Sequence, residues 1–249
     1  MNVLSASYGN DSRAMIQWAR EANLNDVVVA YIDTGWASEQ WQDLVRSSDE
    51  WARSLGFETV TIKPTMRFAD LIRAKKGFPN QRYQWCSGLL KGIPFLNWLD
   101  DLDPDGSSAV FVGKRRDESR ARADTPCVTI SEYHGGRLLI HPLYNHSEAD
   151  RNALLQRAGF DPLPHRSLEC DPCVNANRSD FRRLSAADIA KTAALEAEIG
   201  KTMFRPARHG GAHGIEQVIE WARCSRGQFR HEQDGLFTVG CGSPFGCGL

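Results

Sequence analysis

The chain has 249 residues, 41% of them hydrophobic, and a formal net charge of −1. This length supports one domain with an appendage, and the near-neutral charge neither favours nor excludes nucleic acid as a partner. No apolar run reaches the length of a membrane span and the N-terminus lacks a secretory-signal pattern, so we expect a cytoplasmic protein without membrane contact. The seven cysteines favour metal or redox chemistry in a reducing compartment over a disulfide framework.

The first dozen residues predict an anion-binding turn. Residues 2–7 read as a short buried strand, and a helical pattern follows directly after a polar loop. A tight loop that opens into a helix leaves the first-turn N–H groups unpaired at the positive end of the helix dipole, and Gly9 lets a phosphate approach closely. We expect the ligand to contact Ser5, Ser7, Tyr8, Gly9, Asn10, Asp11 and Ser12. The alternative is that Asp11 or Ser12 only caps the first helix.

Strand and helix patterns then alternate through the first half of the chain. Apolar or β-branched runs predict strands at residues 27–32, 58–63 and 109–113, with helices between them, including residues 68–76 and 89–99. This alternation predicts an α/β fold with a doubly wound, mostly parallel sheet. Ligands bind such sheets at the carboxyl ends of the strands, where the first loop would meet Asp33-Thr34-Gly35 and Gly113-Lys114-Arg115.

The second half of the chain changes character. A hairpin is expected within residues 128–143, turning at Gly135-Gly136. Helical patterns follow at residues 147–158, 185–199 and 214–222. We therefore divide the chain into an α/β domain at residues 1–145 and a smaller helical and irregular region at residues 146–249, which contains cysteines and packs on the same core.

Two cysteines separated by two residues are typical of a metal site. Cys170 and Cys173 can grip one zinc ion or one iron–sulfur cluster, and the remaining ligands would come from Cys86, Cys241 or Cys247. The alternatives are a redox pair or incidental cysteines, and the spacing does not separate zinc from iron.

A basic segment follows the strand at residues 109–113. The guanidinium groups of Arg115, Arg116 and Arg120 can clamp a phosphate or sulfate, although a solvated charged helix start explains the same pattern. Lys91 lies five residues after Cys86 and is a candidate for neutralising ligand charge, with a surface lysine as the alternative.

Together these motifs resemble the phosphoadenosine phosphosulfate (PAPS) reductase family, within the PP-loop adenine nucleotide α-hydrolases. Ser7 to Ser12 resembles the PP-loop pattern Ser-Gly-Gly-x-Asp-Ser, from which Tyr8 and Asn10 depart. The other matching segments are Asp33-Thr34-Gly35, Cys86-x-x-x-Leu90-Lys91-x-x-Pro94, Gly113-x-Arg115-Arg116-x-Glu118-Ser119-x-x-Arg122 and Cys170-x-x-Cys173. The resemblance implies a Rossmann-like sheet whose domain at residues 1–145 binds ATP or a sulfonucleotide.

Two departures from the family favour ATP over a sulfonucleotide. Adjacent cysteines of cluster-bearing reductases are replaced by Trp85-Cys86, and the chain ends in Cys247-Gly248-Leu249 without the usual glutamate and histidine. The first hypothesis is therefore an iron–sulfur ATP pyrophosphatase similar to enzymes of DNA phosphorothioation and tRNA thiolation. It would use ATP, Mg²⁺ and a 4Fe-4S cluster on Cys86, Cys170, Cys173 and Cys241. Asp11 and Lys91 would join the catalytic set, with a sulfur donor such as a cysteine desulfurase and a nucleic-acid target as partners.

Two other functions remain open. In a sulfonucleotide reductase acting on PAPS or adenylylsulfate (APS), Cys247 would attack the sulfate sulfur and thioredoxin would release sulfite. A non-catalytic protein that binds a nucleotide and zinc is the third hypothesis. We expect a homo-oligomer in each case.

Overall fold

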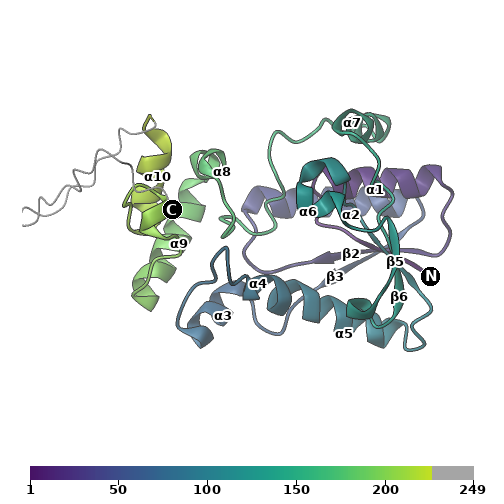
Figure 1. Cartoon of the computed structure of the whole chain (residues 1–249), viewed down its shortest axis with the longest axis horizontal. Helices are drawn as coiled ribbons and strands as arrows, with labels where there is room; N and C mark the ends of the chain where they lie inside the picture. Colours follow the sequence, from purple (N-terminus) through teal and green to yellow (C-terminus); the bar gives the residue numbers. More distant parts are fainter. Residues whose placement is uncertain (226–249) are drawn as a thin grey trace, which may run out of the picture.

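A six-stranded sheet forms the centre of the protein, and the computed structural model describes residues 1–225 (Figure 1). Its strands are β1 (Asn2–Ser5), β2 (Val27–Ile32), β3 (Glu58–Ile62), β4 (Ala109–Val112), β5 (Val128–Ser131) and β6 (Arg137–Ile140). They lie in the order β3-β2-β1-β4-β6-β5, and every neighbouring pair is parallel except β5 with β6. The predicted α/β fold with a mostly parallel sheet is confirmed.

Helices cover both faces of this sheet. The α-helices are α1 (Asn10–Glu21), α2 (Glu39–Ser54), α3 (Phe68–Lys75), α4 (Trp85–Ser87), α5 (Ile93–Leu102), α6 (Arg120–Ala123), α7 (Glu148–Arg157), α8 (Arg178–Arg183), α9 (Ala186–Ile199) and α10 (Gly214–Arg223). Short 3₁₀ turns are η2 (Arg116–Glu118), η3 (Glu132–His134) and η4 (Pro206–Arg208), and η1 (Gly88–Gly92) is a π-helical turn. Within residues 1–225, no helix is long and apolar enough to cross a membrane.

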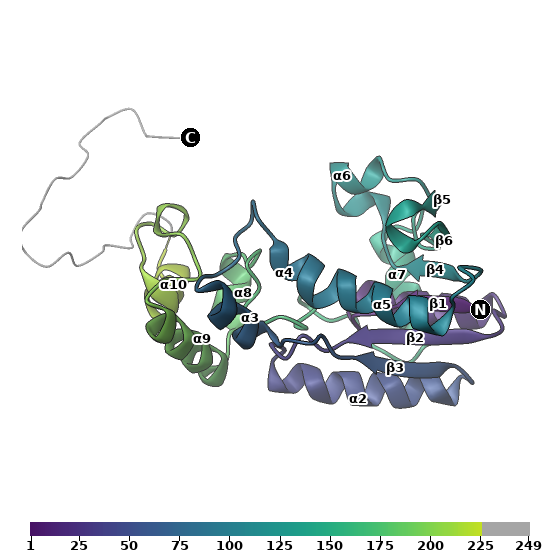
Figure 2. The same cartoon turned by 90° about the horizontal axis from the view of Figure 1, so that it is seen from below.

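Alternation along the strands divides the core into two layers. Leu4, Val29 and Phe111 point to the side covered by α1, α2 and α7, while Val3 and Val110 meet Phe95 and Leu99 of α5 on the other side. Each central strand is therefore apolar on both faces, as its continuous hydrophobic run predicts. Figure 2 shows α2 and α5 on opposite sides of β2 and β3.

The C-terminal helices share a second core with the first half of the chain. Phe181, Leu195 and Ile219 pack in one cluster with Ile72 of α3 and Leu90 of η1. Figure 1 shows α8, α9 and α10 as one group beside α3 and α4. Residues 146–225 are thus helical and irregular, and they join an apolar core to which the α/β part contributes.

The helix expected at residues 89–99 begins differently. A short α-turn at Trp85–Ser87 runs into the π-helical turn η1, and regular α-helix starts only at Ile93. Pro94 lacks the N–H that a regular α-helix would direct at the carbonyl four residues earlier, which favours the wider turn. Lys91 lies within this turn.

Candidate functional site

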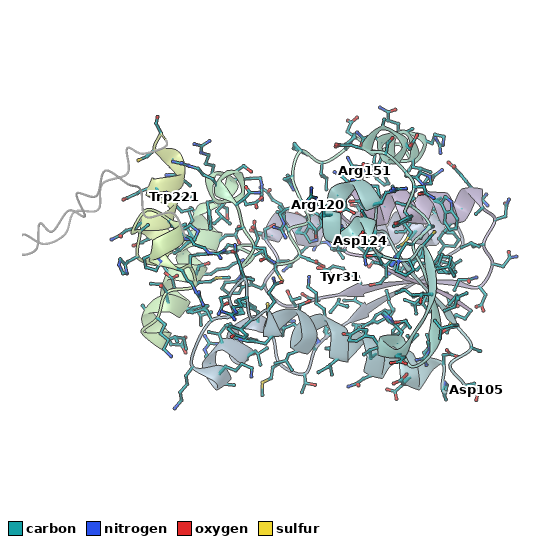
Figure 3. All side chains as sticks on the ribbon, viewed as in Figure 1. Tyr31, Asp105, Arg120, Asp124, Arg151 and Trp221 are labelled. Atoms are coloured by element: carbon teal, nitrogen blue, oxygen red, sulfur yellow. The ribbon has the colours of Figure 1, made fainter. Side chains whose placement is uncertain are left out.

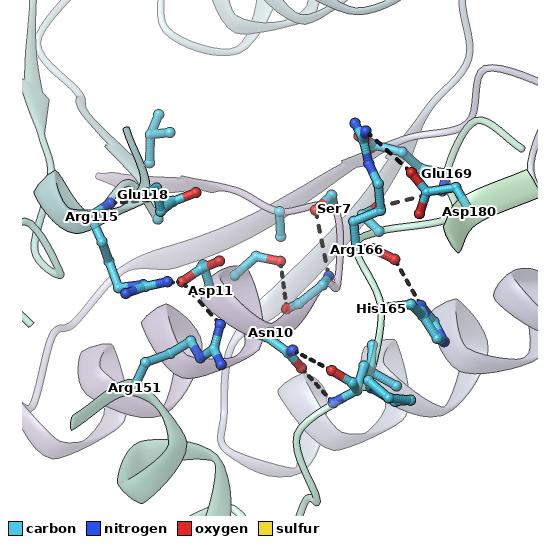
Figure 4. A pocket seen from close by; sticks show the side chains of 18 of the residues that line it. Ser7, Asn10, Asp11, Arg115, Glu118, Arg151, His165, Arg166, Glu169 and Asp180 are labelled. Carbon is cyan, nitrogen blue, oxygen red and sulfur yellow. Dashed lines mark hydrogen bonds and ion pairs between the residues drawn. The ribbon is translucent and has the colours of Figure 1, made fainter. Parts of the chain in front are cut away.

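A pocket of about 970 Å³ opens at the carboxyl ends of β1 and β4, where the strand order reverses (Figure 4). The predicted ligand-contacting residues that line it are Ser5, Ser7, Gly9, Asn10, Asp11, Ser12, Lys91 and Arg115. The predicted residues that lie outside its wall are Tyr8, Asp33, Thr34, Gly35, Arg116 and Arg120. The structure therefore brings together the first loop, Lys91 and Arg115.

The first loop enters α1 as the sequence predicts. Gly9 precedes the helix in an extended conformation, and the Ser12 hydroxyl donates to the Gly9 carbonyl at 3.2 Å. Asn10 fixes the loop from the side, because its amide donates to the Leu163 carbonyl at 2.9 Å and accepts from the Leu163 N–H at 2.8 Å. The loop is therefore held from the linker that follows α7, while the start of α1 faces the pocket.

Gly113 lets β4 approach this loop closely. A Cβ atom at position 113 would lie 2.9 Å from the Asp11 carbonyl oxygen, which real Cβ atoms do not tolerate. The glycine after β4 thus sets the distance between the strand and the start of α1.

The side chain of Tyr8 does not line the pocket, contrary to the prediction that Tyr8 contacts the ligand, and supports the loop from the core instead. Its side chain is fully buried in the core, and its hydroxyl donates to Asp49 of α2. Burial and the Asp49 carboxylate raise the pKa of the Tyr8 hydroxyl, so it stays protonated as a donor. The residue adopts a φ of 57°, the left-handed region where the PP-loop pattern has glycine.

Asp11 lies between two arginines of the pocket wall. Its Oδ1 is 2.6 Å from Nε of Arg115 and 3.9 Å from Nη1 of Arg151 (Figure 4). Arg115 is buried and also pairs with Asp117, and although burial by itself would lower the pKa of its guanidinium, these carboxylates raise it. Arg115 therefore organises acidic side chains as well as facing the ligand space.

The neighbouring arginines of the basic segment do not share this position. Arg116 is exposed and lies over the Tyr144 ring at 5.8 Å, and Arg120 is exposed on α6 (Figure 3). Arg122, one helical turn beyond Glu118, lines the pocket instead and pairs with that glutamate.

Lys91 links the pocket to the cysteines. Its Nζ is 2.5 Å from Oε1 of Glu169, and although burial would lower the pKa of Lys91, the charge of Glu169 and its hydrogen bond raise it. Burial raises the pKa of the Cys170 thiol to about 12 despite the nearby lysine, and burial also raises the pKa of Cys86. Both thiols are therefore protonated at neutral pH unless a metal displaces their protons.

The Asp33-Thr34-Gly35 segment contacts the segment that carries the cysteines and does not line the pocket. The buried Thr34 hydroxyl donates to the Glu169 carbonyl at 2.9 Å and lies 3.3 Å from the Cys170 sulfur. Trp36 forms a parallel bridge with Cys170, and the Asp33 carboxylate accepts from the Gly35 N–H at 2.9 Å. The end of β2 is thereby tied to the segment that carries Cys170 and Cys173.

The described part of the chain contains three of the four predicted metal ligands. Cys86, Cys170 and Cys173 are free thiols that pack against one apolar cluster. Within residues 1–225, no three His, Cys, Asp or Glu side chains are arranged to hold a metal ion. Cys241 and Cys247 lie outside the described residues, so the four-cysteine site stays a prediction.

A second group of pocket residues has no recognisable local pattern in the sequence. The charged members of this group are Glu148, Arg151, Arg166, Glu169, Asp180 and Arg183. Arg151 sits on α7, which the helical pattern at residues 147–158 predicts, but only the packing of α7 on α1 brings it to Asp11. Glu148 also lies on α7, whereas Arg166, Glu169, Asp180 and Arg183 flank the Cys170–Cys173 pair.

Comparison with known families agrees with this geometry. Residues 1–166 match the family described as the phosphoadenosine phosphosulfate reductase domain. The chain belongs to the PAPS reductase family. The match covers β1 to β6, α7 and most of the pocket wall, and ends at Arg166. The members of this family bind nucleotides, which places the pocket in a nucleotide-binding domain.

Individual relatives of this PAPS reductase family member are distant. An uncharacterized protein of Methanocaldococcus jannaschii is 23% identical over 145 residues, which are 58% of this chain and 29% of that protein, so the match spans under a third of the relative. The PAPS reductase of Candida auris, solved as a phosphate complex, is 21% identical with a TM-score of 0.48, covering 67% of this chain and 75% of that one. The NMN synthetase of Francisella tularensis is 15% identical with a TM-score of 0.46, covering 89% and 83%.

Proposed function

We propose that this chain is an ATP pyrophosphatase that adenylates an oxygen of a target molecule and so prepares that target for sulfur transfer. The observation that carries the proposal is the Asp11 carboxylate, which stands in the phosphate-binding loop between Arg115 and Arg151. A carboxylate at this point repels a bare anionic ligand, but it suits a triphosphate that arrives with a divalent cation.

The donor chemistry of the pocket fits Mg²⁺. Asp11 is partly exposed to the pocket, and both of its arginine contacts are to Oδ1. Asp11 and the phosphate oxygens would hold the cation, which when bound neutralises triphosphate charge. The side chains of Arg151 and Arg115 then stabilise the remaining negative charge.

The reaction itself is a displacement at the α-phosphorus of ATP. An oxygen of the target forms a bond to that phosphorus as the bond to the β-phosphate oxygen breaks, so pyrophosphate leaves and the target carries AMP. A donor that delivers sulfur at the oxidation level of sulfide then replaces the adenylated oxygen, and AMP leaves without net oxidation. The persulfide supplied by a cysteine desulfurase reaches that level only when a pair of thiols reduces it by two electrons and becomes a disulfide. The Lys91 ammonium, held charged by Glu169, would stabilise negative charge that develops beside the target.

The cysteines support an accompanying metal centre. Cys86, Cys170 and Cys173 are free thiols that pack against one apolar cluster, and as thiolates they are soft ligands that suit an iron–sulfur cluster, or zinc as the alternative, with Cys241 as the fourth ligand. We propose a 4Fe-4S cluster held by Cys86, Cys170, Cys173 and Cys241. Such a cluster would brace the Cys170 segment behind Lys91.

The test begins with protein purified without oxygen, assayed for iron, zinc and acid-labile sulfide. The protein is then incubated with ATP and Mg²⁺, and pyrophosphate and AMP are measured. We expect Asp11→Asn to raise the Mg²⁺ concentration needed for half-maximal pyrophosphate release, whereas the matched surface change Asp43→Asn leaves it unchanged. Absence of pyrophosphate release from wild-type protein, even with added RNA or DNA, would exclude the proposal.

The family match also supports a second candidate, a sulfonucleotide reductase. In that reaction Cys247 attacks the sulfate sulfur of PAPS or APS, and reduction by thioredoxin releases sulfite. Sulfite formation that requires thioredoxin and is lost in Cys247→Ser would establish this candidate in place of the first. A chain that binds ATP and zinc without turning over either nucleotide would be the non-catalytic protein of the third hypothesis.

A further inference from the structure

The pocket has two ends with separate sets of arginines. The nucleotide end consists of Asp11, Arg115 and Arg151, and the far end consists of Arg166, Ser179, Asp180 and Arg183. Figure 4 shows Asp11, Arg115 and Arg151 together on one side, with Arg166 and Asp180 on the other, and Ser7 and Asn10 between them. A volume of about 970 Å³ lies at the upper end of the roughly 300–1,000 Å³ typical of small-molecule sites, so one nucleotide leaves room.

Two guanidinium groups converge at the far end. Nη1 of Arg166 is 3.9 Å from Asp180, and Nη2 of Arg183 is 3.4 Å from the same carboxylate. The Arg166 guanidinium is anchored by the Asn175 carbonyl at 3.0 Å, yet its side chain is 44% exposed. The Arg183 guanidinium also lies 3.5 Å from Asp171.

These ion pairs are loose compared with a structural pair in the same protein. Arg137 is 2% exposed and approaches its two aspartates at 2.7 and 2.9 Å, the normal length of a charge-assisted hydrogen bond. The far-end arginines lie 3.4 and 3.9 Å from Asp180, which is farther than Arg137 lies from its aspartates. An incoming anion can therefore accept hydrogen bonds from their N–H groups without breaking a tight ion pair. The two guanidinium groups meet at the Asp180 carboxylate, whose charge they compensate, and each keeps further N–H donors that suit a phosphate lying beside Asp180.

Part of the far end lies beyond the family match. The family match ends at Arg166, and Ser179, Asp180 and Arg183 come from α8, beyond that match. The Lys91–Glu169 pair lines the same pocket. The far end therefore shares one pocket with Lys91 and with the nucleotide end.

We infer that Arg166 and Arg183 bind a phosphate group of a second substrate, the molecule that accepts the adenylyl group. The inference rests on the proposed function in that ATP occupies the nucleotide end. The phosphate belongs either to a nucleotide-sized molecule or to the backbone of a nucleic-acid strand, and the two sources share this chemistry.

Binding is measured with the nucleotide end filled by a non-hydrolysable ATP analogue and Mg²⁺. The probes are a short single-stranded oligonucleotide without terminal phosphate and cytidine 5′-monophosphate. We expect Arg166→Gln to weaken binding of the favoured probe by about tenfold or more, since a charge-assisted hydrogen bond is lost. Arg166→Lys should lose less, because the charge stays while the fork is removed. Arg46→Gln, an exposed change on α2, should have no effect.

The two sources separate in the same experiment. A nucleic-acid backbone predicts oligonucleotide binding whose salt dependence falls by about 0.7 in log–log slope in Arg166→Gln, as expected for one lost phosphate contact on a single strand. A small substrate predicts tighter binding of cytidine monophosphate, with the same loss in Arg166→Gln.

Other results overturn the inference. If neither probe binds, or if Arg166→Gln leaves binding unchanged, the far end holds no phosphate. If Arg166→Gln instead weakens the ATP analogue while Arg46→Gln does not, Arg166 belongs to the nucleotide. If the wild-type protein does not bind the ATP analogue, that result counts against the proposed function alone. The inference is tested separately, by comparing how strongly the two probes bind to wild type and to Arg166→Gln. Arg183→Gln gives a second readout, with its folding checked by circular dichroism because Arg183 also pairs with two buried aspartates.

Discussion

Two adjacent arginines differ sharply in this protein although the sequence treats them alike. Arg115 is buried and pairs with Asp11 and Asp117, whereas Arg116 is exposed beside Tyr144. Removal of Arg115 would take charge-assisted hydrogen bonds from Asp11 and Asp117, whose side chains are partly exposed. The same residue type is thus structural and ligand-facing at one position and a surface residue at the next.

We predict that Arg115→Ala lowers the free energy of unfolding by about 1.5–3 kcal/mol, because Asp11 and Asp117 lose the charge-assisted hydrogen bonds from their shared cation. Nucleotide affinity should fall as well, since Asp11 loses its orientation. Urea denaturation and calorimetric titration with the ATP analogue measure the two effects. Arg116→Ala is the matched control and should change stability by no more than about 0.5 kcal/mol. Equal losses in both variants would contradict the structural role given to Arg115.

Gly113 supports a second prediction, because its missing side chain allows the close approach of β4 to the first loop. Gly113→Ala places a Cβ 2.9 Å from the Asp11 carbonyl oxygen and 3.1 Å from its carbon, both backbone atoms that cannot rotate away. We expect a loss of about 1–3 kcal/mol in stability, together with weaker nucleotide binding as the loop shifts.

Gly88→Ala is the control for that variant. A Cβ at position 88 meets nothing within 4 Å and the residue is helical, so alanine should raise stability by about 0.5–1 kcal/mol. Thermal melts of both variants give the comparison. A stable Gly113→Ala protein with unchanged nucleotide affinity would show that the loop does not depend on this contact.

At the scale of elements, Arg137 of β6 joins the sheet to the end of α5. Its guanidinium binds Asp100 and Asp103, and Asp103 also accepts from the backbone and hydroxyl groups of Ser107 and Ser108. Burial alone would raise the pKa of Asp103, but hydrogen bonds from Ser108, Arg137 and Ser107 hold it far below the usual 3.8.

This pair predicts how stability changes in acid. Because the pKa of Asp103 is lower in the folded than in the unfolded protein, its contribution is complete above about pH 4 and is lost as the pH falls further. Asp103→Asn should therefore be less stable than wild type at pH 7, by about 3–5 kcal/mol for a broken buried pair. The difference should shrink as the pH falls below 4, as measured by urea denaturation at each pH. A difference that does not depend on pH would mean that Asp103 acts by packing alone.

Elements with a strong local pattern were predictable, and features that depend on distant contacts were not. The strands at Val27–Ile32 and Ala109–Val112 follow from continuous apolar runs, and α7 follows from the helical pattern at residues 147–158. The π-helical turn η1 was missed because Pro94 acts within an otherwise regular helical pattern. Tyr8 was assigned to the ligand because the motif places a loop residue there, whereas its partner Asp49 lies forty-one residues away.

The residues of the candidate site likewise fall into a predictable group and an unpredictable group. The first loop and Arg115 were found because strand ends converge in a parallel sheet, a rule that needs only chain order. Arg166, Asp180 and Arg183 reach the pocket only because Thr34 and Trp36 bind the Cys170 segment across more than a hundred residues of sequence. No local pattern encodes that contact, so the far end was invisible in the sequence.

At the scale of the whole molecule, the two halves of the chain cannot bury their apolar surfaces independently. The second core combines Trp36, Phe68 and Ile72 of the α/β part with Phe181 and Ile219 of the C-terminal helices. Polar contacts also join the two halves, including the ion pair between Arg73 and Glu198 at 2.7 Å. Separating the halves would expose this shared cluster to water, at a cost of about 25 cal/mol for each Å² of apolar surface.

We therefore predict that the metal-free protein unfolds in one cooperative transition, with equal calorimetric and van't Hoff enthalpies. Ile72→Ala, in α3, should lower the stability of the C-terminal helices as much as that of the sheet, by about 2–5 kcal/mol, since its fully buried side chain packs in the shared core. Near-ultraviolet signals from Trp221 in α10 and from Trp41 in α2 can follow the two regions separately, each isolated by replacing the other tryptophans. Two resolved transitions, with Ile72→Ala shifting only one, would instead make residues 1–145 and the helices after them separate folding units.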